Sequence, residues 1–201
     1  KGGGADITIN GGTVTANGGF YAAGIGGGYN RSGCYITING GKVKATGINA
    51  TGIGGGYYGI GDNITINGGT VRAYGGDLAA GIGGGLGGNG FDITIKGGMV
   101  MAYGGENASG IGKGPDAIID NDIAVATTLI VKAGNTENPT NVIENTGDDL
   151  AVSLRGKQFV TITEPYFNIT ANQDPDDETH YYSTFYSRTC DYQVPSGVIA
   201  Y

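Results

Sequence analysis

The chain has 201 residues, of which 43 are glycine, and it carries a formal net charge of −7 with a pI of about 4.5. Glycine does not recur at every third residue, which excludes collagen, and the abundant Ile, Val, Ala and Tyr exclude a flexible Gly/Ser linker. The acidic charge disfavours nucleic acid as a partner, and no apolar run approaches the roughly eighteen residues of a transmembrane segment.

A phrase of alternating apolar and polar residues occurs four times. "ITINGGTVTA" begins at Ile7, and close copies begin at Ile36, Ile64 and Ile93, which are intervals of 29, 28 and 29 residues. Period-two alternation of β-branched residues is typical of strands, and the Asn-Gly-Gly in the middle tolerates a bend. A fixed period of this length indicates stacked repeats. Each copy is therefore predicted to form a strand, a corner and a second strand.

A glycine-rich phrase follows each copy. "AAGIGGG" begins at Ala22, and related phrases begin at Ala50, Ala79 and Ala108. We interpret it as the third side and last corner of a coil, with glycines that let backbones approach closely. The predicted fold is all-β: a single-stranded, right-handed parallel β-helix with coils of 28–29 residues. An antiparallel hairpin with a two-residue Asn-Gly turn ranks second, because it leaves the glycine-rich phrase without a partner strand.

Stacked coils place equivalent residues in columns. The predicted interior columns are Ile7, Ile36, Ile64 and Ile93; Val14, Val43, Val71 and Val100; and Ile25, Ile53, Ile82 and Ile111. Asn10, Asn39 and Asn67 are predicted to form a ladder of stacked side-chain amides at one corner, which Lys96 interrupts in the fourth coil.

The repeat decays after Gly114. Residues 126–134 and 150–162 still alternate like strands, so we predict a β-helix over 1–163, with regular repeats over 1–115 and irregular capping coils over 116–163. Residues 164–201 are predicted to be a linker and a truncated β-rich segment, and we expect the chain to be part of a longer protein. A bridge between Cys34 and Cys190 is the less favoured alternative, because the two residues lie in different segments and two unpaired thiols are preferred.

The repeated phrases, followed by "LIVKAG" and "FVTI", resemble repeat regions of large, adhesin-like cell-surface proteins of gut Bacteroidetes and Firmicutes. The tail "YYSTFYSRTCDYQVPSGVIAY" resembles the start of a β-module of Bacteroidetes surface proteins. The resemblance implies an extracellular location at the bacterial cell surface and a ligand on a host or polysaccharide surface. It implies no catalytic residues.

Aromatic residues are the candidate binding residues. Tyr74 and Tyr103 are equivalent and should stack, while Tyr29, Tyr57 and Tyr58 lie on loops beside the glycine-rich side, as do Phe20 and Tyr21. Exposed rings can bind the flat faces of sugars. The alternative is that these rings cover loop backbone and the ends of the core.

Carboxylates do not gather into a predicted catalytic site. Asp77 and Glu106 occupy equivalent loops, and we interpret them as a solvated edge. Asp6 and Asp92 are predicted to precede their strands. The weak candidates for Ca²⁺ lie in a predicted charged loop, Asp174, Asp176, Asp177 and Glu178, and after the regular coils, Asp116, Asp120 and Asp122.

Three functions remain, in order of preference. The first is a non-enzymatic adhesin-like or display and spacer module without a cofactor. The second is a carbohydrate-binding module that uses the tyrosine loops, with or without Ca²⁺. The third is a polysaccharide lyase or hydrolase, which would need a carboxylate or basic cluster in one groove.

Overall fold

The computed structural model describes residues 3–117, 123–125, 130–136, 139–143, 157–163, 170–174 and 177–184. The chain divides into two compact units, Lys1–Glu164 and Pro165–Tyr201. The described residues contain strands and turns but no α-helix, so no helix among them is long and apolar enough to cross a membrane.

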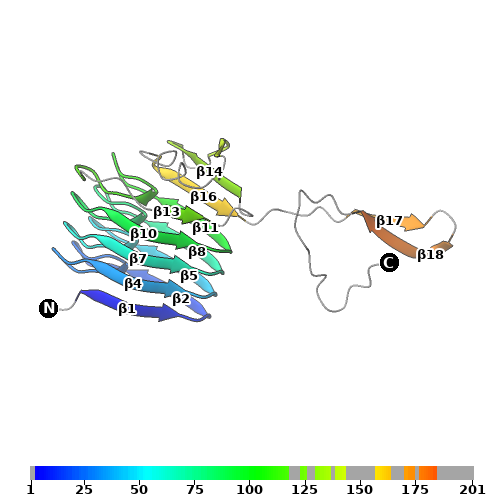
Figure 1. The fold of residues 1–201 in the computed structure, drawn as a ribbon, viewed down its shortest axis with the longest axis horizontal. Helices are drawn as coiled ribbons and strands as arrows, with labels where there is room; N and C mark the ends of the chain where they lie inside the picture. Colours follow the sequence, from blue (N-terminus) through cyan, green and yellow to red (C-terminus); the bar gives the residue numbers. More distant parts are fainter. Residues whose placement is uncertain are drawn as a thin grey trace. The chain divides into compact units, whose positions relative to one another are not determined.

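The first unit is a stack of coils with three sheets (Figure 1). Sheet A contains β1 (Gly4–Ile9), β4 (Gly33–Ile38), β7 (Gly61–Ile66), β10 (Gly90–Ile95) and β13 (Ile123–Val125). Sheet B begins with β2 (Thr13–Asn17), β5 (Lys42–Thr46), β8 (Thr70–Tyr74) and β11 (Met99–Tyr103). Sheet C contains β3 (Ile25–Gly26), β6 (Ile53–Gly54), β9 (Ile82–Gly83) and β12 (Ile111–Gly112).

Strands of neighbouring coils pair in parallel at equivalent positions. Ile7 pairs with Ile36, Val14 with Val43, and Ile25 with Ile53. This confirms the predicted parallel β-helix and excludes the antiparallel hairpin over the four regular coils. Each coil therefore supplies one strand to each sheet, and the glycine-rich phrase forms the third side.

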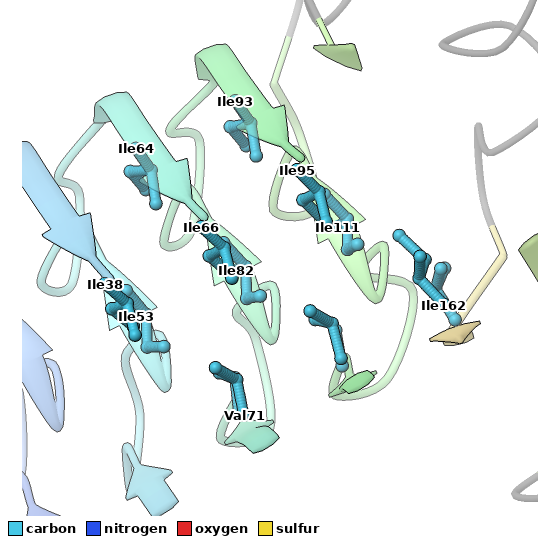
Figure 2. Close-up of a cluster of buried hydrophobic side chains, with 14 of the residues drawn as sticks. Ile38, Ile53, Ile64, Ile66, Val71, Ile82, Ile93, Ile95, Ile111 and Ile162 are labelled. Carbon is cyan, nitrogen blue, oxygen red and sulfur yellow. The ribbon is translucent and has the colours of Figure 1, made fainter. Parts of the chain in front are cut away.

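The core runs along the inside of the stack. Figure 2 shows Ile38, Ile66 and Ile95 of sheet A projecting into the same interior as Ile53 and Ile82 of sheet C. All five side chains are fully buried, and each contributes about 1.5–3 kcal/mol of hydrophobic stabilisation. Equivalent residues of the first coil are only partly buried, because a second coil covers them on one side alone: Ile7, Ile9, Val14 and Ala16.

The glycines of sheet C explain the glycine-rich phrase. Gly54 and Gly83 have φ values of 129° and 133°, a region that L-residues with a side chain avoid. A Cβ on Gly54 would overlap the carbonyl oxygen of Gly83 in the next coil. The phrase therefore recurs because each coil brings its backbone against the next one at this position.

Sheet A contains a feature that the sequence pattern did not predict. Asp6, Tyr35, Asn63 and Asp92 lie inside their strands with left-handed φ values of 58°, 54°, 51° and 46°, and the pairing register skips them. The prediction that Asp6 and Asp92 precede their strands is thus wrong, because each strand begins two residues earlier. In β4, for example, the consecutive side chains of Cys34 and Tyr35 both face outward, and Ile36 then points into the core.

The end of the stack differs from the predicted succession of irregular coils. β13 continues sheet A in parallel, but β16 (Phe159–Thr163) lies antiparallel between β11 and β14 (Ile130–Gly134), and β15 (Val142–Ile143) pairs with β14. Val131 and Ile162 both turn into the core. Period-two alternation specifies which face of a strand is buried but not its direction, so the sequence could not distinguish a further coil from this antiparallel cap.

The second unit contains one antiparallel pair, β17 (Thr170–Asp174) and β18 (Asp177–Thr184). The predicted charged loop is therefore mostly strand: Asp174 ends β17, while Asp177 and Glu178 begin β18. Asp176, Cys190 and the stretch after Thr184 lie outside the described residues.

Candidate functional site

Four tyrosines meet at one corner of the first two coils, and we call them the tyrosine cluster: Tyr21, Tyr29, Tyr57 and Tyr58. Tyr21 lies in the loop between β2 and β3, Tyr29 between β3 and β4, and the other two between β6 and β7. Tyr29 and Tyr57 directly follow the glycine-rich phrase in consecutive coils. The coil spacing therefore places them side by side.

The rings of the cluster pack in a fixed arrangement. Tyr29 and Tyr57 are nearly parallel, with planes 12° apart and centroids separated by 6.2 Å. Tyr21 packs against both rings, with centroids 5.3 Å from Tyr29 and 5.0 Å from Tyr57. Tyr58 meets Tyr57 edge-on at 4.4 Å, and Phe20 meets Tyr21 edge-on at 4.7 Å. Such edge-to-face contacts orient the rings before any ligand binds.

Backbone hydrogen bonds position these loops. The Tyr57 N–H donates to the Tyr21 carbonyl oxygen at 3.1 Å, and the Asn30 N–H donates to the Tyr57 carbonyl oxygen at 2.7 Å. Tyr58 has a left-handed φ of 61°, as does Asn30 at the equivalent position of the preceding coil with 54°. The cluster is thus built on the coil stack and not on one long loop.

The cluster is open to solvent. Tyr29 is 58% exposed, Tyr58 51% and Tyr21 42%, and the four rings line an open depression of about 460 Å³. The pKa of the Tyr57 hydroxyl is raised above its ordinary value, first because the neighbouring rings shield it from water and then because it hydrogen bonds with the Tyr58 hydroxyl. The depression therefore presents apolar ring surface beside hydroxyl groups that can donate and accept hydrogen bonds.

Tyr74 and Tyr103 stack on the outer face of sheet B, with centroids 4.7 Å apart and planes 3° apart. Their outer ring faces are also occupied. The Lys44 ammonium lies 5.6 Å from the Tyr74 centroid, and Phe159 of β16 meets Tyr103 edge-on at 5.7 Å. The pair offers ring edges and hydroxyls, so its faces are not available to stack on a sugar.

The corner asparagines hydrogen bond along the stack. Asn39 Nδ2 donates to Asn10 Oδ1 and Asn67 Nδ2 donates to Asn39 Oδ1, each at 2.7 Å. These bonds tie three coils together at the corner between sheets A and B. The ladder is structural, because its amides bond to one another.

Among the residues that the structure describes, no three His, Cys, Asp or Glu side chains gather as metal ligands. Asp77 and Glu106 are exposed on their equivalent loops, and Asp116 is exposed after β12. The remaining Ca²⁺ candidates have side chains or whole residues outside the described part of the chain: Asp120, Asp122, Asp174, Asp176, Asp177 and Glu178. Calcium binding therefore stays a prediction.

Cys34 faces outward from β4 and is partly buried as a free thiol. Burial raises the pKa of this thiol, and the Asp62 carboxylate on the next strand raises it further. Because the thiolate is the reactive form, Cys34 is a poor nucleophile in this position.

A family model described as a β-helix repeat matches residues 7–29, 36–57, 64–86 and 93–112. A search of curated proteins and a search of solved structures find no significant match for the chain. The four matched segments coincide with the four regular coils, each running from a sheet A strand to the glycine-rich side. Residues 7–112 are therefore a parallel β-helix repeat region.

Proposed function

We propose that this chain is a non-enzymatic, adhesive module of a cell-surface protein that binds carbohydrate through the tyrosine cluster. The observation that carries the proposal is the open depression lined by Tyr21, Tyr29, Tyr57 and Tyr58. A rigid aromatic surface binds the apolar faces of sugars at a small entropic cost, and the hydroxyls of the cluster can hydrogen bond to sugar hydroxyls.

The lining of the depression favours binding over catalysis and over a passive spacer. Hydrolysis or elimination at a sugar needs a carboxylate or a basic side chain at the scissile bond, and the depression is lined by tyrosine alone. A passive spacer needs neither a depression nor exposed rings, which bring an unfavourable contact with water. An extracellular location belongs to the same proposal and rests on the resemblance to adhesin-like surface proteins.

A glycan array followed by calorimetry on the best glycan tests the proposal. The informative variants are Tyr29→Leu and Tyr58→Asn, because the equivalent position of Tyr29 in the third coil is Leu86 and that of Tyr58 in the first coil is Asn30. Each replacement therefore suits its place in the fold while it removes one ring. We expect each variant to bind the glycan at least tenfold more weakly than the unchanged chain.

The matched control is Tyr74→Leu, which removes an outward ring that has both faces occupied. Its affinity should equal that of the unchanged chain. Absence of glycan binding, or an equal loss in Tyr74→Leu, would refute binding at the tyrosine cluster. Repeating the array with a chelator tests the calcium-assisted alternative, in which binding would disappear without Ca²⁺.

A further inference from the structure

The outer faces of sheets A and B carry opposite charges. The outward positions of the described sheet B strands hold four cationic residues and no carboxylate: Lys42, Lys44, Arg72 and Lys132. The outward positions of the described sheet A strands hold three carboxylates and no Lys or Arg: Asp6, Asp62 and Asp92. A face without carboxylates is unexpected in a chain whose net charge is −7.

No ion pair between described residues neutralises the charges of either face. Lys44 and Arg72 are directly paired on neighbouring strands, where like charges repel. Within the described part of the chain, neither side chain forms an ion pair with a carboxylate. Asp62 and Asp92 likewise lie on neighbouring strands, and Asp62 accepts a neutral hydrogen bond from Asn63 Nδ2 at 3.2 Å. Both faces would therefore gain from a partner of opposite charge.

The two faces have the same strand spacing along the stack. Both are ladders of strands about 4.8 Å apart, so their charges follow the same period along the stack. A column of paired threonines runs along sheet A: Thr8, Thr37, Thr65 and Thr94. Apolar groups flank the charges on both faces, including Tyr35, which is 58% exposed on sheet A, and Met101 on sheet B.

The available area predicts a weak contact. The four six-residue strands of sheet A cover about 19 Å by 20 Å, and the three-residue β13 adds about 50 Å², which gives roughly 430 Å² on each partner. The total of roughly 850 Å² is in the range of weak, transient protein–protein interfaces. Association through these faces therefore needs a high local concentration of the chain.

We propose that copies of this chain associate side by side, with sheet A of one copy against sheet B of the next. The two surfaces in contact are different, so every added copy leaves one free face of each kind. The contact therefore adds copies in a row, or in a ring if the rotation between copies closes, and does not stop at a symmetric dimer. This proposal uses different residues from the tyrosine cluster and is independent of carbohydrate binding.

Sedimentation velocity over 0.02–1 mM protein, in roughly 0.15 M and 1 M salt, tests the proposal. We expect the weight-average sedimentation coefficient to rise with concentration in 0.15 M salt, where the Debye length is about 8 Å. The rise should disappear in 1 M salt, where that length is about 3 Å. An unchanged chain that stays monomeric in 0.15 M salt overturns the proposal.

Charge reversal locates the contact. Lys44→Glu with Arg72→Glu lowers the charge of the sheet B face from +4 to zero, because Lys42 and Lys132 remain, and should abolish association. Arg31→Glu with Lys96→Glu changes the net charge equally at two exposed positions outside both faces, and it should leave association unchanged. Equal behaviour of the two double variants overturns the proposal, because net charge alone would then govern association.

A complementary variant makes the test decisive. Asp62→Lys, Thr65→Lys and Asp92→Asn reverse the sign of sheet A, and asparagine suits the left-handed position because Asn63 already occupies it in the preceding coil. This variant should be monomeric alone but associate when mixed with Lys44→Glu/Arg72→Glu, because the mixture joins the unchanged sheet B of the first variant to the unchanged sheet A of the second. If the mixture stays monomeric, or if the unchanged monomer instead binds polygalacturonate through Lys44 and Arg72, the partner is not a second copy.

Discussion

Replacing Gly54 with alanine tests why the glycine-rich phrase recurs. Gly54 lies inside the stack, with coils on both sides, and has a φ of 129°. A Cβ at this position would overlap the Gly83 carbonyl oxygen, which is backbone and cannot rotate away. Removing the overlap therefore requires the third sides of two coils to move apart. The paired strands of sheets A and B oppose this movement, because they hold the same two coils at the normal distance between hydrogen-bonded strands.

The expected loss of stability has two parts. The unfavourable backbone conformation costs about 1–3 kcal/mol once a side chain is present. Forcing an extra carbon into a filled space costs about 1–3 kcal/mol more. Gly54→Ala should therefore lower the free energy of unfolding by about 2–6 kcal/mol, a large part of the roughly 5–15 kcal/mol that stabilises a typical domain.

Urea unfolding followed by circular dichroism measures the effect, with Gly40→Ala as the matched control. Gly40 is in the same coil, and a Cβ there would lie an ordinary 3.7 Å from the Asn10 carbonyl oxygen. Gly40→Ala should change the free energy of unfolding by less than about 1 kcal/mol, in either direction. A loss below about 1 kcal/mol in Gly54→Ala, or equal losses in both variants, would refute the close-contact explanation.

Three further predictions concern the asparagine ladder, the left-handed residues of sheet A and the tyrosine cluster. Asn39→Ala removes two amide hydrogen bonds of the asparagine ladder and should lower the free energy of unfolding by about 1 kcal/mol. Lys96→Asn extends the same ladder by one coil and should raise the free energy of unfolding. Urea unfolding measures both variants, and no change in either would count against a stabilising ladder. Tyr35→Asn should raise the free energy of unfolding by up to about 1 kcal/mol, because asparagine tolerates the left-handed φ of 54° at this position. Tyr35→Ala keeps the unfavourable backbone conformation and should give no such gain. The raised pKa of Tyr57 means that its stabilising contribution is complete below the ordinary tyrosine pKa of about 10 and is lost as the pH rises through the folded pKa. Absorbance titration should show that Tyr57→Phe removes a phenol that ionises later than a free tyrosine, and removal of an earlier one would contradict the assignment.

The period of the repeat predicts the core columns because stacking converts sequence spacing into spatial neighbours. Ile36, Val43 and Ile53 are buried as the spacing requires, and the amide ladder follows from the same register. The sequence indicates less clearly the column of left-handed residues in sheet A, which consists of Asp6, Tyr35, Asn63 and Asp92. Asp, Asn and Asp at three of its four positions hint at it, but Tyr35 at the fourth conceals the pattern.

The tyrosine cluster could be predicted only in part. The sequence places Tyr29 and Tyr57 in consecutive coils, but Tyr21 joins them from a different loop, through a hydrogen bond between coils. The occupied faces of the Tyr74 and Tyr103 pair depend on Phe159, which follows from the direction of β16. Such contacts arise from tertiary packing between segments far apart in the sequence and have no local signal.

The antiparallel β16 also has a consequence for how such a chain can lengthen by gene duplication. A duplicated coil between β4 and β11 would meet the same register above and below it, so every column would continue and the rod would grow by about 4.8 Å for each 28–29 residues. A duplicate added after β11 would instead have to displace a strand that runs the opposite way. The rod can therefore change its reach by whole coils in its middle, while its C-terminal end stays the same.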